Sequence, residues 1–104
     1  MKTFYHVTPK KNIKSIMKYG LIPKIGSRSK KLKEERCVFL FPSIEVMECA
    51  LEQWFGECFS EKTTLAALEV AVPDDFPIQD STVGYEKVSK IPIPPAYIKM
   101  IFAV

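Results

Sequence analysis

The chain has 104 residues and a mass of 11.9 kDa, and 47% of its residues are hydrophobic. A chain of this size forms one hydrophobic core, so we expect a single domain over residues 1–104 rather than a disordered or multidomain protein. No apolar run reaches the roughly 20 residues that a membrane span requires, and no signal-peptide stretch follows residues 1–3. The sequence therefore predicts a soluble cytoplasmic protein with no membrane partner.

The net charge of +3 is unevenly distributed along the chain. Residues 1–36 hold eleven lysines or arginines against two acids, whereas residues 37–104 hold four against ten. A basic region of this size favours contact with phosphate, either of a nucleotide or of a nucleic-acid backbone. The alternative is that the individual lysines form a solvated face without a ligand.

The three cysteines, Cys37, Cys49 and Cys58, form no CxxC pair. An odd number of cysteines in a chain without an export signal predicts reduced thiols. We expect no metal site, because Cys49 and Cys58 lie nine positions apart and the single histidine is distant in sequence. Cys49, on a predicted helix, is expected to be a small core residue.

The first elements are predicted from aromatic and β-branched residues followed by a helical period. Residues 3–7 indicate a strand, with Thr8 as the N-cap of a helix and Pro9 at its first position. This helix is expected to run to about Tyr19 and to end at Gly20. Its apolar face is expected to hold Ile13, Ile16 and Met17.

Residues 24–36 have no apolar period and predict a basic loop that could border a site. Residues 37–41 form a continuous apolar run, which is typical of a strand inside a sheet. Ser43 is a suitable cap for a second helix that reaches about Phe55. The apolar stripe of that helix is expected to hold Ile44, Met47, Leu51 and Trp54 or Phe55.

The second half of the chain is predicted to consist of strands. Residues 64–72 indicate one strand, which ends at the turn-forming residues 73–75. After a polar connection over residues 80–84, further strands are predicted over residues 85–91 and 97–104. The resulting order, β-α-β-α-β-β-β, indicates an α+β domain rather than a doubly wound parallel sheet.

Four stretches, taken in order, carry a resemblance to a known family: FYHVT with KYGLIP, then CVFLFPS, then LEVAVP, and last GYEKVSKIPIPPAYI. Together they resemble the ADP-ribosyltransferase fold, in its compact microbial and phage members and, more distantly, poly(ADP-ribose) polymerases and RNA 2′-phosphotransferases. The resemblance covers almost the whole chain. It implies a phage or bacterial protein in which two N-terminal helices pack on a mixed or antiparallel split β-sheet.

The resemblance implies that His6 and Thr8 belong to the first motif of the family. A histidine at this position hydrogen-bonds a ribose hydroxyl of NAD, since an imidazole both donates and accepts. The neighbouring backbone and the hydroxyl at the position of Thr8 hold the nicotinamide amide. The alternative for His6 is a histidine hydrogen-bonded into the core or into a helix start.

The second motif implies an aromatic wall for the nicotinamide pocket, for which Phe39 and Phe41 are the candidates. Strand alternation puts the two rings on one side, which could equally face the core. The following helix lacks the tyrosine that some family members use for stacking. Arg28 is a candidate for the pyrophosphate on charge alone, because a guanidinium binds phosphate oxygens in a bidentate way.

The third motif implies that Glu86 is the catalytic acid. In the family this carboxylate accepts a hydrogen bond from the 2′-hydroxyl of the nicotinamide ribose and stabilises the oxocarbenium-like cation as nicotinamide leaves. The alternative for Glu86 is a solvent-facing strand residue paired with a lysine. Asp80 is the second candidate for the acid.

The resemblance therefore implies a small mono-ADP-ribosyltransferase that uses NAD as co-substrate and no metal. Its acceptor would be a protein or nucleic acid contacted through the basic N-terminal region. One alternative is a catalytically inactive relative that acts as a binding or inhibitory module through the same surface. A third, an RNA 2′-phosphotransferase, is disfavoured because the chain has only two arginines, Arg28 and Arg36.

Overall fold

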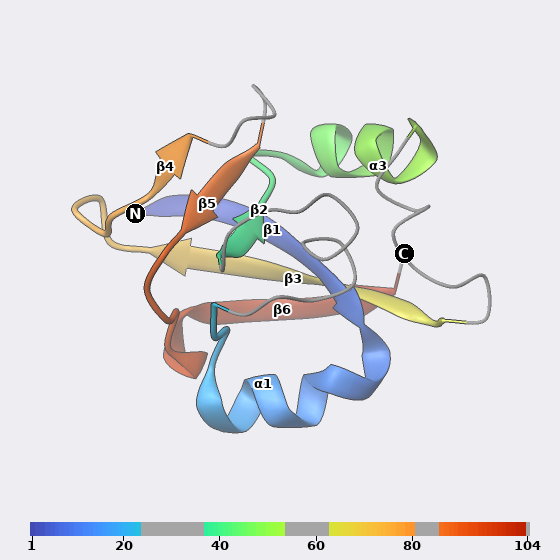
Figure 1. Ribbon diagram of the computed structural model, residues 1–104, viewed down its shortest axis with the longest axis horizontal. Helices are drawn as coiled ribbons and strands as arrows, with labels where there is room; N and C mark the ends of the chain where they lie inside the picture. Colours follow the sequence, from blue (N-terminus) through green and yellow to red (C-terminus); the bar gives the residue numbers. More distant parts are fainter. Residues whose placement is uncertain (24–36, 54–62, 81–85, 104) are drawn as a thin grey trace.

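The computed structural model describes residues 1–23, 37–53, 63–80 and 86–103. Within these ranges the chain is an α+β domain with two α-helices and two three-stranded sheets (Figure 1). The elements in chain order are β1 (Lys2–Pro9), the 3-10 helix η1 (Lys10–Asn12), α1 (Ile13–Tyr19), β2 (Val38–Leu40), α3 (Ile44–Gln53), β3 (Leu65–Val72), β4 (Gln79–Asp80), β5 (Lys87–Ser89), the 3-10 helix η3 (Pro95–Tyr97) and β6 (Ile98–Ala103).

The two sheets have the strand orders β1-β3-β6 and β2-β5-β4. All strand pairings recorded in the described ranges are antiparallel. A single bridge between Tyr5 of β1 and Phe41, which directly follows β2, joins the sheets. The amide of each residue donates to the carbonyl of the other, at 2.9 and 2.8 Å. The strands therefore follow one another in the order β6-β3-β1-β2-β5-β4, with a narrow junction in the middle.

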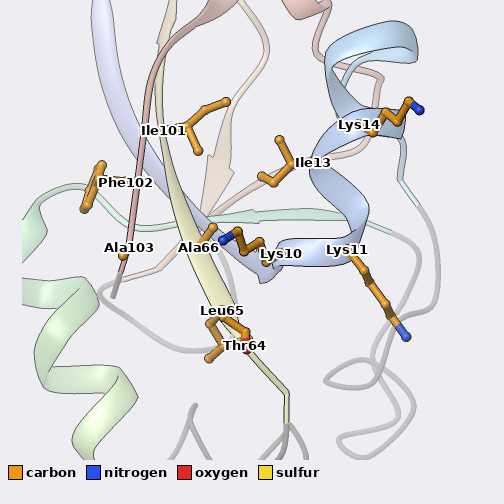
Figure 2. A pocket seen from close by; sticks show the side chains of 10 residues that line it. All are labelled: Lys10, Lys11, Ile13, Lys14, Thr64, Leu65, Ala66, Ile101, Phe102 and Ala103. Atoms are coloured by element: carbon orange, nitrogen blue, oxygen red, sulfur yellow. The ribbon is translucent and has the colours of Figure 1, made fainter.

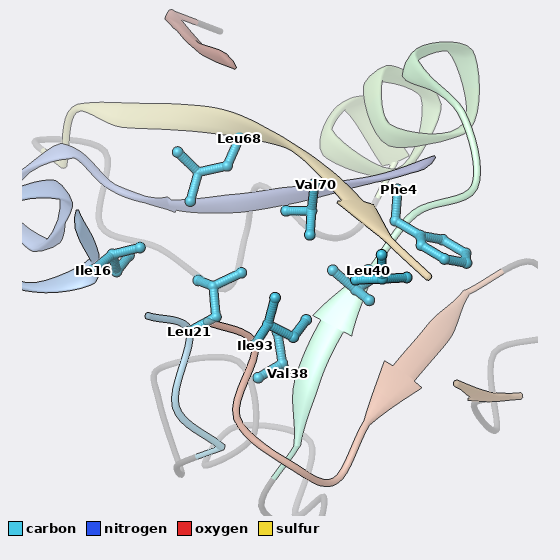
Figure 3. Close-up of a cluster of buried hydrophobic side chains, with 9 residues drawn as sticks. Phe4, Ile16, Leu21, Val38, Leu40, Leu68, Val70 and Ile93 are labelled. Atoms are coloured by element: carbon cyan, nitrogen blue, oxygen red, sulfur yellow. The ribbon is translucent and has the colours of Figure 1, made fainter. Parts of the chain in front are cut away.

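Helices α1 and α3 lie on opposite sides of the strands (Figure 1), and the two core clusters use opposite faces of the β1-β3-β6 sheet. Successive residues of β3 point to opposite faces, so Leu68 meets α1 whereas Ala67 meets α3. The α1 cluster contains Phe4, Ile16, Leu21, Val38, Leu40, Leu68, Val70, Val72 and Ile93 (Figure 3). The α3 cluster contains Val7, Phe41, Met47, Ala50 and Ala67. The short strand β2 thus contributes to one core, and the residue after it contributes to the other.

The prediction that Thr8 caps a helix is wrong. Strand β1 continues through Pro9, Thr8 pairs with Ala66 of β3, and the Thr8 side chain is buried. Pro9 has extended backbone angles, φ −56° and ψ 135°, and the helical path starts only afterwards, in η1. Eight consecutive pairs with β3 favour the extended strand more than one capping hydrogen bond favours a helix start. The end of α1 at Tyr19 agrees with the prediction.

The start of α3 confirms the prediction for Ser43, whose Oγ accepts a hydrogen bond from the amide of Val46 at 3.1 Å. Met47 is fully buried, as expected, but Ile44 and Cys49 are exposed. The helix turns by about 100° per residue, which carries Cys49 away from the buried stripe that Met47 shares with Ala50. Cys49 is therefore not the core residue that the sequence predicted. Trp54 and Phe55 lie outside the described residues.

In the second half, β3 and β6 confirm two predicted strands, and the turn after Val72 confirms the predicted break. The two-residue strand β4 was not predicted, and β5 is shorter than the expected strand over residues 85–91. Tyr97 belongs to η3 rather than to the last strand. None of the helices in the described ranges has the length and the apolar character that crossing a bilayer requires.

Gly20 ends α1 and lets the chain after this helix pack closely against the segment that follows β5. Its φ is +88°, and a Cβ at this position would lie 2.3 Å from the carbonyl oxygen of Ile93. The close approach allows Leu21 and Ile93 to exchange backbone hydrogen bonds of 2.8 and 2.9 Å. Only glycine combines this conformation with this distance.

We expect Gly20→Ala to lower the free energy of unfolding by at least about 2 kcal/mol, because it adds both backbone strain and a clash with a backbone atom. Chemical denaturation monitored by circular dichroism measures the change. Lys18→Ala, at an exposed site on the same helix, should stay within about 0.5 kcal/mol of the parent protein. Equal stability of Gly20→Ala and the parent would contradict the proposed constraint.

Candidate functional site

The candidate site is the junction where β1 and β2 separate. After the Tyr5–Phe41 bridge, the next hydrogen-bonded pair of an antiparallel ladder would join Val7 to Phe39. Among the described residues, backbone hydrogen bonds between the two strands are recorded only at the bridge. The carbonyl of Phe39 instead accepts a hydrogen bond from Nδ1 of His6, at 2.7 Å. A side chain therefore takes the place of the ladder at the point where the sheets part.

This hydrogen bond determines the proton position on the His6 ring. A carbonyl oxygen only accepts, so Nδ1 must carry a proton. In the neutral ring Nε2 is then a hydrogen-bond acceptor, and the backbone contact holds the ring in one orientation. The side chain is half-buried, at the end of a short aromatic stretch of β1. The arrangement is a fixed imidazole at the junction of two strands, and it lies inside β1 rather than at the strand end that the sequence predicted.

The two phenylalanines differ in their surroundings. Phe41 has no exposed surface and packs in the α3 cluster beside Val7 and Met47. Phe39 is 8% exposed and its backbone contacts His6 directly. The structure therefore places Phe41 in the core, the alternative that alternation left open. Phe39 contacts the imidazole through its backbone carbonyl, and strand alternation puts its ring on the side of β2 that Phe41 shares.

Thr8 lies two positions after His6 and on the same face of β1. Its side chain is buried, and its Oγ1 accepts a hydrogen bond from Nδ2 of Asn12 at 3.4 Å. The hydroxyl thus contacts the start of the helical segment. Arg28, the residue predicted to bind pyrophosphate, lies outside the described residues.

Glu86 precedes β5 and is fully buried. In the β2–β5 ladder, Leu40 pairs with Lys87, and continuing that register by one residue places Glu86 opposite Phe41. Since Phe41 bridges to Tyr5, Glu86 shares the sheet face of Phe41 and Tyr5, and its strand is separated from β1 only by β2. His6, the residue after Tyr5, points to the opposite face, which it shares with Leu68. A carboxylate without exposure to water is retained only where its surroundings compensate its desolvation. The alternative prediction, a solvent-facing glutamate, is therefore wrong.

Asp80, the second candidate acid, lies in a different environment. It is exposed on the edge strand β4, and its Oδ1 accepts a hydrogen bond from Nζ of Lys87 on β5. This ion pair ties the outer strand to the strand that follows Glu86. The exposure of Asp80 makes it a weaker electrostatic group than a buried carboxylate.

The sequence interpretation missed a second polar pair beside the junction. The Tyr5 hydroxyl donates to Oε1 of Glu69 at 3.3 Å, across the β1–β3 ladder. Burial raises the pKa of Tyr5 above its ordinary value of 10.0, and the negative charge of Glu69 raises it further. The tyrosine ring also meets Phe102 edge to face, with centroids 6.4 Å apart. The available signal was a single acid inside the apolar run of residues 65–72.

No protein family model, no curated protein and no solved structure matches the chain. Within the described ranges, no group of three or more histidine, cysteine, aspartate or glutamate side chains is placed to hold a metal ion.

The raised pKa of Tyr5 predicts an alkaline loss of stability. The folded state holds the phenol proton more tightly than the unfolded state, so this contribution is complete below pH 10 and is lost as the pH rises above it. We expect Tyr5→Phe to show a shallower decline of unfolding free energy between about pH 9 and 11.5. Urea denaturation across this pH range measures the decline. Tyr19→Phe is the control, because Tyr19 is exposed. Parallel curves for Tyr5→Phe and the parent protein would refute the assignment.

Proposed function

We propose that the chain is a small mono-ADP-ribosyltransferase that transfers ADP-ribose from NAD to a protein or nucleic-acid acceptor. His6 orients the NAD ribose, Phe39 borders the nicotinamide, and Glu86 stabilises the cation that forms as nicotinamide departs. The proposal combines the resemblance of the four sequence stretches to the ADP-ribosyltransferase fold with the arrangement of the β1–β2 junction. We also propose that this α+β domain has the ADP-ribosyltransferase fold.

One observation carries the proposal: β1, β2 and β5, whose residues or immediate neighbours include His6, Phe39 and Glu86, are consecutive in the strand order. These residues are separated by up to 80 positions in the sequence. Sequence motifs alone indicate these three residues, without reference to the strand order. Adjacency of all three strands is required if the residues serve one ligand, and that ligand must reach both sheet faces where β1 and β2 separate.

The proposed reaction breaks the bond between nicotinamide and C1′ of its ribose, and the electron pair leaves with the nicotinamide nitrogen. Positive charge then develops on C1′ and the ring oxygen, and a buried carboxylate such as Glu86 opposes it in a low-dielectric environment. The acceptor atom forms the new bond to C1′ and releases its proton. Nε2 of His6, the acceptor in the neutral ring, accepts a hydrogen bond from a ribose hydroxyl. This hydrogen bond positions the dinucleotide.

The direct test measures nicotinamide released from NAD by the purified protein with a mixture of candidate acceptors. We expect Glu86→Gln to reduce release by about 10²- to 10³-fold while NAD binding changes little, because the amide keeps the shape and removes the charge. Binding is followed separately by an NAD-dependent shift of the melting temperature. Release by Glu86→Gln at the parental rate would show that the mechanism is wrong.

Two further variants make this test specific. Glu69→Gln is a matched control, since it also replaces a strand acid by its amide and retains an acceptor for the Tyr5 hydroxyl. It should keep the parental rate within a few-fold. Asp80→Asn separates the two candidate acids. If Asp80→Asn abolishes release and Glu86→Gln does not, the catalytic acid is the exposed one.

The second candidate is a catalytically inactive relative of the same fold that binds a partner. It is favoured by the complete burial of Glu86 and Phe41, which leaves neither side chain with surface for a ligand to contact. The exposed lysines of the first helical segments supply its binding surface. They are Lys10, Lys11, Lys14 and Lys18. The absence of any NAD-dependent thermal shift, together with salt-sensitive binding to an anionic partner, would support this candidate over the transferase.

A further inference from the structure

A hollow of about 490 Å³ lies at β3 and β6, whereas the proposed NAD site lies at β1, β2 and β5. It is enclosed by η1 and the start of α1 on one side and by the adjacent ends of β3 and β6 on the other (Figure 2). Its volume falls within the range of small-molecule sites, about 300–1,000 Å³. None of the residues that the proposed transferase uses lines it.

The hollow results from small side chains at one cross-strand pair. Ala66 of β3 pairs with Ala103 of β6, so only methyl groups cover this part of the sheet. Farther along the sheet the larger Ile101 closes the space, and Ile13 of α1 points toward it from the helix (Figure 2). The floor and walls are therefore predominantly aliphatic, although the space between them is open.

The rim of the hollow carries positive charge. Lys10, Lys11 and Lys14 line it, and no acidic residue is among its described lining residues. Figure 2 shows the Lys10 side chain extending from η1 toward β3, whereas Lys11 and Lys14 extend away from the hollow. One ammonium group thus lies over the apolar floor, and two others add to the local positive potential.

We propose that this hollow is a binding site for a medium-chain aliphatic carboxylate. The hydrocarbon chain lies over Ala66 and Ala103 between the two isoleucines, and the carboxylate meets the ammonium group of Lys10. An apolar floor with one inward cation matches a ligand with one apolar body and one anionic head. The site is independent of NAD, and its occupancy does not depend on transferase activity.

The experiment follows the alanine methyl resonances of the full-length protein during titration with hexanoate, octanoate and decanoate below their micellar concentrations. We expect saturable shifts at Ala66 and Ala103, and none at Ala50, which is buried in the α3 cluster. Each methylene removed from the ligand should weaken binding about fourfold. Absence of saturable shifts at both hollow alanines would overturn the proposal.

Charge recognition is tested with 1-octanol, which has the chain length of octanoate without the carboxylate. Octanol should bind more weakly, and Lys10→Gln should weaken octanoate binding about threefold to tenfold. Lys18→Gln is the matched control, because Lys18 is exposed on α1 and does not line the hollow. Equal binding of octanol and octanoate, or equal effects of the two lysine variants, would overturn the assignment of the carboxylate to Lys10.

Discussion

The structure depends on one short contact between its two sheets. Tyr5 and Phe41 exchange two backbone hydrogen bonds, and beyond them the β1–β2 ladder gives way to the hydrogen bond between His6 and the Phe39 carbonyl. A continuous ladder would close this space with backbone. Because an imidazole occupies it instead, a group that both donates and accepts hydrogen bonds lies at the boundary between the sheets. The proposed binding of NAD depends on this junction, because His6 and Glu86 point to opposite faces of the sheet and only the space between β1 and β2 lies next to both strands' neighbours.

The same junction organises the hydrophobic interior. Leu40 packs toward α1, whereas Phe41, the next residue, packs toward α3 and bridges to β1. Adjacent residues at the end of β2 therefore anchor two cores on opposite faces of one sheet. This explains why the short strand β2 is buried throughout. A substitution here affects both cores and the orientation of the candidate site together.

Local patterns predicted most elements, because alternation, helical period and terminators act within a few residues. Strands β1 and β3, the Ser43 cap and the stop at Gly20 are of this kind. The prediction of a helix cap at Thr8 was wrong, because pairing of the whole strand β1 with β3 outweighed the local capping preference of threonine. For the site, motif resemblance selected His6 and Glu86, but the burial of Glu86 and the Tyr5–Glu69 pair depend on contacts between distant segments. A single sequence carries no direct signal for those contacts.

The pairing of β1 with β3 also bears on how the protein forms during synthesis. Partners in this ladder lie between 56 and 70 positions apart, from Pro9–Leu65 to Lys2–Val72. Strand β1 must therefore wait until at least 56 further residues have been synthesised before its main partner exists. Such distant pairing slows folding, and until it occurs the aromatic residues of the first strand remain open to chaperones or to neighbouring nascent chains.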